Sequence, residues 1–178
     1  MAESAIPAGM TELALGDPVA AERYLREGYG AFGAMGERRY RSSIATLLAE
    51  ALYAQGRFDE ARQMTDEAQA LTLPDDLGPE VRERAIAAKL LAVRGHFAAA
   101  LRLADEAEAL VTPSYLLYQA VVQMAKAEVH RLAGTPRQAE RCLRAALRIY
   151  EDRRAIALAE QAKTALTRLT AEPGREPA

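Results

Sequence analysis

One short stretch of the chain has the glycine spacing of a phosphate-binding loop. Residues 28–33 read Gly-Tyr-Gly-Ala-Phe-Gly, and in nucleotide-binding proteins this spacing lets backbone N–H groups approach a phosphate at the start of a helix. Such a loop has to follow a β-strand, whereas the apolar residues before Gly28 have helical spacing. We therefore expect no phosphate site here. The glycines should instead weaken a helix, with a kinked or mobile segment between Gly28 and Gly36.

Four arginines are the most regular charged feature of the sequence. Their spacings of 4, 3 and 4 residues place them on one face of a helix: Arg137, Arg141, Arg144 and Arg148. Such a stripe of guanidinium groups can receive an acidic partner or a phosphate. A solvated face is the commoner explanation of a charge run, with Glu140 pairing with Arg144 and the acidic residues of 105–108 nearby. The sequence leaves both interpretations open.

No other group of residues has the spacing of a catalytic or metal site. His96 falls in an expected turn and His130 in an expected helix, and neither has a second ligand at metal-binding spacing. Cys142 lies in an Ala/Leu/Arg helical pattern, where cysteine usually behaves as a small hydrophobic residue. We therefore expect no catalytic residues, no metal and no cofactor, and hence no enzymatic activity.

Composition narrows the classes of partner. The 178 residues carry a net charge of -2, so the chain lacks the basic excess typical of nucleic-acid binding. No run of about 18 apolar residues occurs, and the first residues do not resemble a secretion signal. These features predict no nucleic-acid partner, no membrane association and a cytoplasmic location. The abundant alanine and arginine suggest a GC-rich, bacterial source.

Glycine turns recur along the chain at a nearly fixed interval. Gly16, Gly56, Gly95 and Gly134 are separated by 40, 39 and 39 residues, and helical patterns fill the intervals. We expect an all-α chain whose helix pairs bury each other's apolar faces. The predicted domain is 1–171, followed by a disordered tail at 172–178. Its expected repeats are 2–36, 40–73, 80–112 and 114–150, with a capping helix at 152–170.

Helix ends can also be predicted from local signals. The second and third repeats should contain helices at about 41–55, 58–71, 80–94 and 97–110. Asp17 before Pro18 has the pattern of a helix N-cap. Thr135, followed by a proline and then by Gln138, has the spacing of a capping box.

Aligned on their turns, the repeats resemble the tetratricopeptide repeat, and residues 56–61 are close to that family's turn sequence. The family places small residues where its helices cross. Those positions are occupied here by Gly9, Ala49, Ala88, Ala127, Ala21, Ala61, Ala100, Ala139, Gly28, Ala68, Ala107 and Ala146. The resemblance implies a right-handed α-α superhelix of about four helix pairs plus the capping helix.

The sequence departs from the family pattern in two ways. Its repeats have about 40 residues instead of about 34, and smaller residues replace the usual tryptophan and tyrosine of the first helix. Long repeats of this kind are similar to the helical regions of bacterial LuxR-type ATP-binding regulators and nucleotide cyclases. The chain could therefore be a sensory or regulatory fragment of a larger signalling protein.

The resemblance further implies a concave surface lined by the first helix of each pair, which would bind a protein or peptide. The residues expected on this concave groove are Thr46, Glu50, Tyr53, Lys89, Met124, Glu128, Arg131, Glu160 and Lys163. Some relatives bind a C-terminal carboxylate with asparagines, and this chain contains no asparagine. The leading interpretation is a non-enzymatic scaffold or regulatory module that binds a protein segment.

A second candidate surface is a run of large apolar residues at the start of the fourth repeat. One helical face cannot bury four consecutive large side chains. The run consists of Tyr115, Leu116, Leu117 and Tyr118. It could mediate self-association, which would give a homodimer, or pack against the preceding connection.

Overall fold

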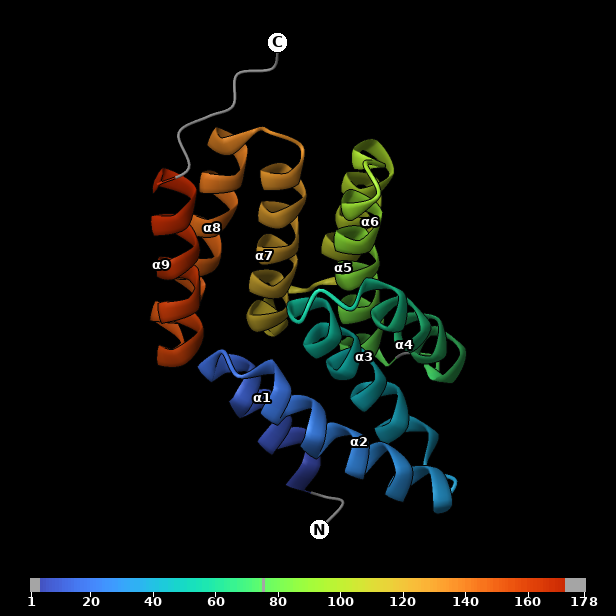
Figure 1. Cartoon of the computed structure of the whole chain (residues 1–178). Coiled ribbons are helices and arrows are strands. Elements are labelled where there is room, and N and C mark those ends of the chain that lie inside the picture. The colour runs from blue at the N-terminus through green and yellow to red at the C-terminus, as the bar shows by residue number, and fades with distance from the viewer. Residues whose placement is uncertain (1–3, 75, 172–178) are drawn as a thin grey trace. The chain divides into compact units, whose positions relative to one another are not determined.

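The computed structural model describes residues 4–74 and 76–171, and this part of the chain contains helices and no strands (Figure 1). The predicted all-α fold is confirmed. The helices are α1 (Ala5–Leu15), α2 (Pro18–Ala34), α3 (Arg38–Ala54), α4 (Phe58–Leu71), α5 (Leu77–Val93), α6 (Phe97–Leu110), α7 (Leu116–Leu132), α8 (Pro136–Asp152) and α9 (Ile156–Ala171). A short 3₁₀ turn, η2 (Pro113–Tyr115), precedes α7. The tail predicted to be disordered, 172–178, lies outside the described residues.

The chain forms two compact units, Met1–Ile86 and Ala87–Ala178, which we call the N-terminal and C-terminal units. In the N-terminal unit α2 packs on α1 and α3, and α3 packs on α4. In the C-terminal unit α7 packs on α6 and α8, and α8 packs on α9 (Figure 1). Each of these helices thus packs mainly on its neighbours in the sequence, as expected for a chain of helix pairs.

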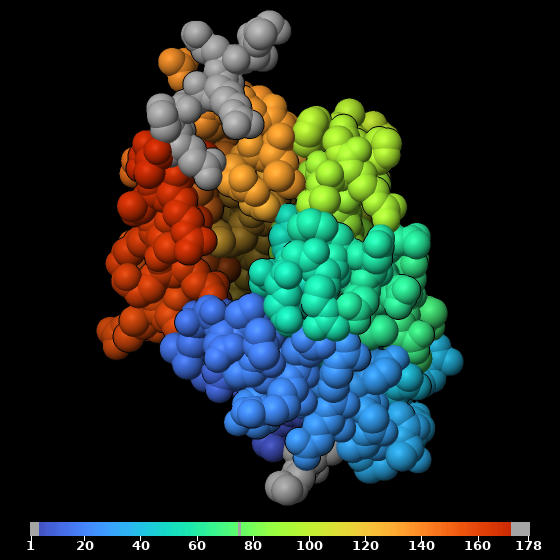
Figure 2. Space-filling view, in the orientation of Figure 1, coloured from blue at the N-terminus to red at the C-terminus, as the bar shows by residue number. Residues whose placement is uncertain are grey.

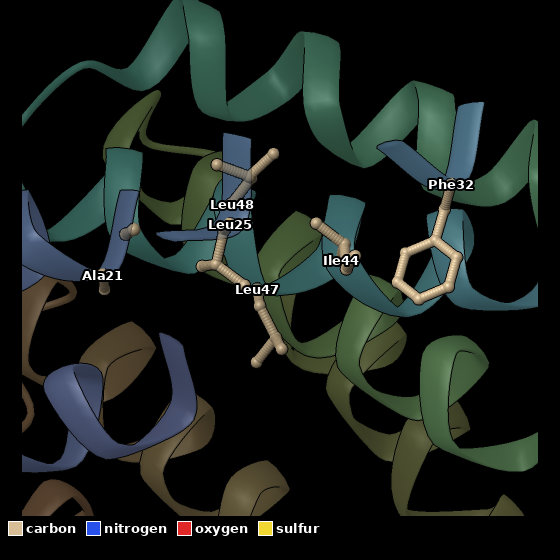
Figure 3. Close-up of a cluster of buried hydrophobic side chains, with 7 residues drawn as sticks. Ala21, Leu25, Phe32, Ile44, Leu47 and Leu48 are labelled. Atoms are coloured by element: carbon tan, nitrogen blue, oxygen red, sulfur yellow. The ribbon is translucent and has the colours of Figure 1, made fainter. Parts of the chain in front are cut away.

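The core of the N-terminal unit is built from the apolar stripes of α2 and α3. Leu25 and Phe32 from α2 meet Ile44, Leu47 and Leu48 from α3, and all five are at most 4% exposed (Figure 3). The stripes match because residues three or four positions apart share one face of a helix. Partly buried side chains of α1 and α4 complete the cluster.

The small residues predicted at helix crossings are buried throughout. Gly9 and Gly28 are buried, and the ten alanines of the set are at most 3% exposed. At Gly9 a Cβ atom would lie 2.5 Å from Cγ of Leu25, so the crossing of α1 and α2 has no room for a side chain. The repeat register predicted from the sequence is therefore confirmed.

The predicted glycine turns are also present. Gly16, Gly56, Gly95 and Gly134 have φ between 69° and 83°. In this left-handed region glycine ends a helix without the steric penalty of a Cβ. The bounds predicted for 58–71 and 97–110 match α4 and α6.

Other helix ends differ from the prediction. α3 and α5 begin at Arg38 and Leu77, three residues before the predicted starts. α8 continues to Asp152, so the capping helix α9 starts at Ile156 and not at 152. The turn between them uses Arg154 with φ of 55°, and an arginine in this conformation leaves no glycine signal in the sequence.

One local prediction was wrong. Thr135 occupies the N-cap position of α8, but its side chain makes no cap hydrogen bond and donates instead to the carbonyl of His130, 3.0 Å away. α2 continues without interruption through Gly28, Gly30 and Gly33 to Ala34, and a kink or mobility at these glycines stays a prediction. The burial of Phe32 in the core explains why this glycine-rich segment stays helical.

Asp17, in contrast, caps α2 as predicted, because its Oδ1 accepts a hydrogen bond of 2.9 Å from the backbone N–H of Ala20. At the other end of the chain α9 presents an exposed face (Figure 2). This face carries Glu160, Lys163 and Arg168, which suits the terminal helix of a repeat array.

Candidate functional site

The C-terminal unit contains an open groove of about 740 Å³. It forms because α6 and α8 both pack on α7 and make at most marginal contact with each other. α7 therefore supplies its floor and the other two helices its walls. The lining residues are Leu101 and Asp105 from α6, Gln123, Lys126 and His130 from α7, and Gln138, Arg141, Cys142, Arg144, Ala145, Leu147, Arg148 and Glu151 from α8.

The amphipathic pattern of α8 directs the arginines away from the core. Its inward face consists of Ala139, Leu143, Ala146 and Tyr150, all at most 5% exposed. Each arginine of the stripe stands two positions before one of these residues, which is about 200° around the helix. All four arginines are accordingly exposed. Three of them, Arg141, Arg144 and Arg148, line the groove, whereas Arg137 does not.

Lys126 binds two of the three acidic residues of α6. Its Nζ lies 2.6 Å from Oδ1 of Asp105 and also contacts Oε2 of Glu108, which accepts a further hydrogen bond of 2.7 Å at Oε1 from Gln123. Burial alone would lower the pKa of Lys126, but the hydrogen bonds to Asp105 and Glu108 outweigh it and raise that pKa. These carboxylates therefore neutralise a lysine on the groove floor, not the arginine stripe.

The stripe itself is only partly neutralised. The predicted pair of Arg144 with Glu140 is confirmed, with Nη2 and Oε1 2.7 Å apart. Among the residues that the structure describes, Arg137, Arg141 and Arg148 form no ion pair with a carboxylate. Two cations with unused hydrogen-bond donors, Arg141 and Arg148, thus border a hollow whose lining also includes the apolar side chains of Leu101 and Leu147.

Cys142 and His130 also line this groove, but their surroundings do not activate them. Cys142 is half-buried, and burial raises the pKa of its thiol, which keeps it protonated at neutral pH. Nδ1 of His130 lies 2.9 Å from Oγ1 of Thr135, and burial lowers the pKa of the imidazole. Within 4–74 and 76–171, no three histidine, cysteine or acidic side chains are grouped so that they could hold a metal ion.

Two of the residues expected on the concave groove do not form an open surface, and a third is half-buried. Thr46 is 2% exposed and donates a hydrogen bond of 2.8 Å to the carbonyl of Ser43. Lys89 is 8% exposed. Met124 packs against a core cluster that includes Ala120 and Tyr150. The expectation of an open surface was wrong for Thr46 and Lys89, because the first helices are covered on more of their circumference than one amphipathic stripe implies. Met124 is half-buried, and its place on the groove stays a prediction.

The other six expected groove residues keep some solvent exposure. Glu50 and Tyr53 are half-buried, and the ring of Tyr53 packs at 5.2 Å from that of Phe58. The remaining four form local ion pairs, of 2.7 Å between Glu128 and Arg131 and of 3.0 Å between Glu160 and Lys163.

The apolar run before and within α7 is divided between core and solvent. Tyr115 and Leu117 are 50% and 48% exposed, whereas Leu116 and Tyr118 are half-buried. The rings of Tyr115 and Tyr118 lie 6.3 Å apart. Two large apolar side chains thus remain at the surface, and the self-association expected from this run stays a prediction.

Sequence reasoning found the arginine wall of the groove but not its floor. Gln123, Lys126 and His130 are spaced 3 and 4 residues apart, so they share one face of α7. That spacing was the available signal. This spacing indicates a groove floor only once α6 and α8 are known to pack on either side of that face of α7.

Comparison with known protein families identifies the repeats. Two models described as tetratricopeptide repeat match residues 12–77 and 84–106, which together make up half of the chain. The chain is a tetratricopeptide repeat protein. The resemblance stated from the turns and small residues is thereby confirmed, whereas the similarity to LuxR-type regulators and cyclases stays a prediction.

A comparison of this tetratricopeptide repeat protein with curated proteins found none that matches it. Its family generally mediates contacts between proteins. In the part of the chain that the structure describes, no helix combines the length and apolarity that crossing a membrane requires.

Proposed function

We propose that this protein is a non-enzymatic interaction module that binds a segment of another protein. The observation that carries this proposal is the repeat register, in which the helix-crossing positions of the matched repeats are small and buried. Many of the apolar side chains are buried between helices, while polar side chains remain on exposed helix surfaces. An array of this kind presents extended surfaces for recognition.

The arrangement of polar groups also favours binding over catalysis. In the groove, burial raises the pKa of the Cys142 thiol, which disfavours a thiolate nucleophile, and burial lowers the pKa of His130, which makes its imidazole a weaker base. Lys126 is held by two carboxylates. The groove thus offers fixed charges and apolar contacts, which are the elements of a recognition surface.

Purified binding partners provide the direct test. The chain serves as bait in an extract of its native host, and each specifically retained protein is then produced separately and titrated against the chain by calorimetry. We expect saturable binding of at least one protein, with a defined stoichiometry. Absence of saturable binding for every retained protein would refute the proposal.

A charge-swapped variant tests the concave groove that is expected from the sequence. Glu160→Lys combined with Lys163→Glu keeps the net charge and reverses the pair of these two residues on an exposed face of α9, and it replaces the contact of Lys163 with Glu151 by two like charges. If the first helices contribute to recognition, this double variant weakens the partner's binding. Unchanged binding would exclude this part of α9 from the interface.

A further inference from the structure

We infer that the groove between α6 and α8 binds an acidic, amphipathic segment of the partner protein through Arg141, Arg144 and Arg148. This inference rests on the proposed function and specifies the surface and the chemistry of the partner. The arginines line an open groove of about 740 Å³ in the C-terminal unit. Two of them, Arg141 and Arg148, have no carboxylate partner among the described residues.

Charge alone would give weak binding, because an ion pair between exposed side chains contributes little and is screened by salt. The groove adds an apolar component, since Leu101 from α6 and Ala145 and Leu147 from α8 also line it. A partner that places apolar side chains over these residues and carboxylates over the arginines would use both. This requirement selects an amphipathic segment over a uniformly acidic one.

The spacing of the arginines indicates how the acidic residues should be arranged. Arg141 and Arg148 are two turns apart on α8, about 10 Å along its axis, and Arg144 lies between them. A helical segment running along α8 would match them with acidic residues three or four positions apart. Guanidinium groups bind such carboxylates through paired N–H donors.

Carboxylates bordering the groove favour a peptide over a nucleic acid. Asp105 and Glu151 line the groove, and Glu140 lies next to Arg144. A nucleic acid presents a phosphate at every nucleotide and would bring some of them against these carboxylates. A peptide can place neutral residues there and acidic residues only opposite the arginines.

The test uses a labelled synthetic peptide about as long as α8, with glutamates at every third or fourth position and leucines beside them. A second peptide has glutamine in place of each glutamate. Single-stranded RNA of similar length is the nucleic-acid probe. Fluorescence anisotropy measures the affinity of each probe for the full chain at low salt and at about 0.15 M salt.

Two double variants with equal changes in charge separate the groove from general electrostatics. Arg141→Glu with Arg148→Glu alters the groove. Arg102→Glu with Arg137→Glu alters exposed arginines of α6 and α8 that do not line it. Circular dichroism verifies that both remain helical.

We expect the glutamate peptide to bind the unmodified chain and to lose about tenfold or more in affinity with the groove variant. The Arg102/Arg137 variant should bind the glutamate peptide almost as tightly as the unmodified chain does. The glutamine peptide should bind the unmodified chain much more weakly, and higher salt should reduce the affinity for the glutamate peptide. Equal losses in both variants would overturn the inference, as would tighter binding of RNA or no peptide binding. If a natural partner still binds saturably in any of these cases, the proposed function stands and only the groove assignment fails.

Discussion

Single residues set how closely the helices approach. Gly9 lies where α1 packs on α2, and the Cβ of any other residue would lie 2.5 Å from Cγ of the fully buried Leu25. The equivalent positions of the later repeats are buried alanines, so those crossings accommodate a Cβ atom. The N-terminal crossing is therefore the most sensitive to added volume.

Gly9→Ala should destabilise the protein by about 1–2 kcal/mol, since overpacking against Leu25 outweighs the helix propensity that alanine gains. Gly30→Ala is a matched control, because Gly30 is an exposed helical glycine with nothing within 4 Å of its added Cβ. It should stabilise by about 0.5–1 kcal/mol. Urea denaturation followed by circular dichroism measures both, and equal effects would contradict the close approach.

Glu83 is a single residue whose charge opposes folding. Burial raises its pKa to about 7; Arg84 acts against the rise, and the nearby Glu80 and Asp66 add to it. The folded state thus holds a proton that the unfolded state releases near its ordinary pKa. Stability from this group is full at low pH and is lost as pH rises through about 7.

Glu83→Gln should therefore stabilise the protein at pH 8, by about 1 kcal/mol once the partial exposure of the carboxyl is allowed for. Below the unfolded pKa, at about pH 4, the variant and the unmodified chain should be equally stable. Denaturation curves at the two pH values measure the difference. An equal difference at both would show that ionisation of Glu83 is not its cause.

At the scale of elements, polar contacts connect one repeat to the next. Glu22 on α2 accepts hydrogen bonds of 2.8 Å from Gln55 and 2.6 Å from Arg57, both in the turn before α4. Burial would raise the pKa of Glu22, but the hydrogen bonds from Gln55 and from Arg26 and the charge of Arg57 lower it. The side chain of Glu22 is only 12% exposed, so this contact holds the α3–α4 turn against α2 at a place that little solvent reaches.

Helix starts add smaller, local contributions. Asp17→Ala removes the acceptor for the Ala20 N–H at the start of α2 and should cost about 1 kcal/mol. Asp17→Asn keeps an acceptor oxygen and should cost less. Thermal unfolding compares the two variants, and equal losses would show that the cap hydrogen bond contributes nothing measurable.

The elements were largely predictable from the sequence, and the exceptions have physical causes. Periodic apolar residues and glycine turns located α4 and α6, because both signals act within a few residues. The end of α8 was missed since Arg154 takes a left-handed conformation without a glycine. The side chain of Thr135 was misassigned because the carbonyl of His130 competes with the cap position for its hydroxyl.

At the scale of the whole molecule, the repeat register could be predicted but the candidate site only in part. The arginine stripe follows from spacing along one helix. The groove depends on α6 and α8 flanking α7, and the burial of Thr46 depends on several helices packing around α3. The residue pattern of a single helix does not show how its neighbours pack. A helix face that this pattern predicts to be exposed can therefore be covered by other helices.

The interaction function and the groove together lead to one central claim, that a partner's acidic segment lies along α8. Site-specific photo-crosslinking in the native host tests it most directly, with the photoreactive residue placed at Arg148 in the groove or at Arg102 outside it. The account predicts crosslinks from position 148 to a segment rich in Asp and Glu, identified by mass spectrometry, and few from position 102. Crosslinks from position 102 alone, or none from position 148, would contradict it.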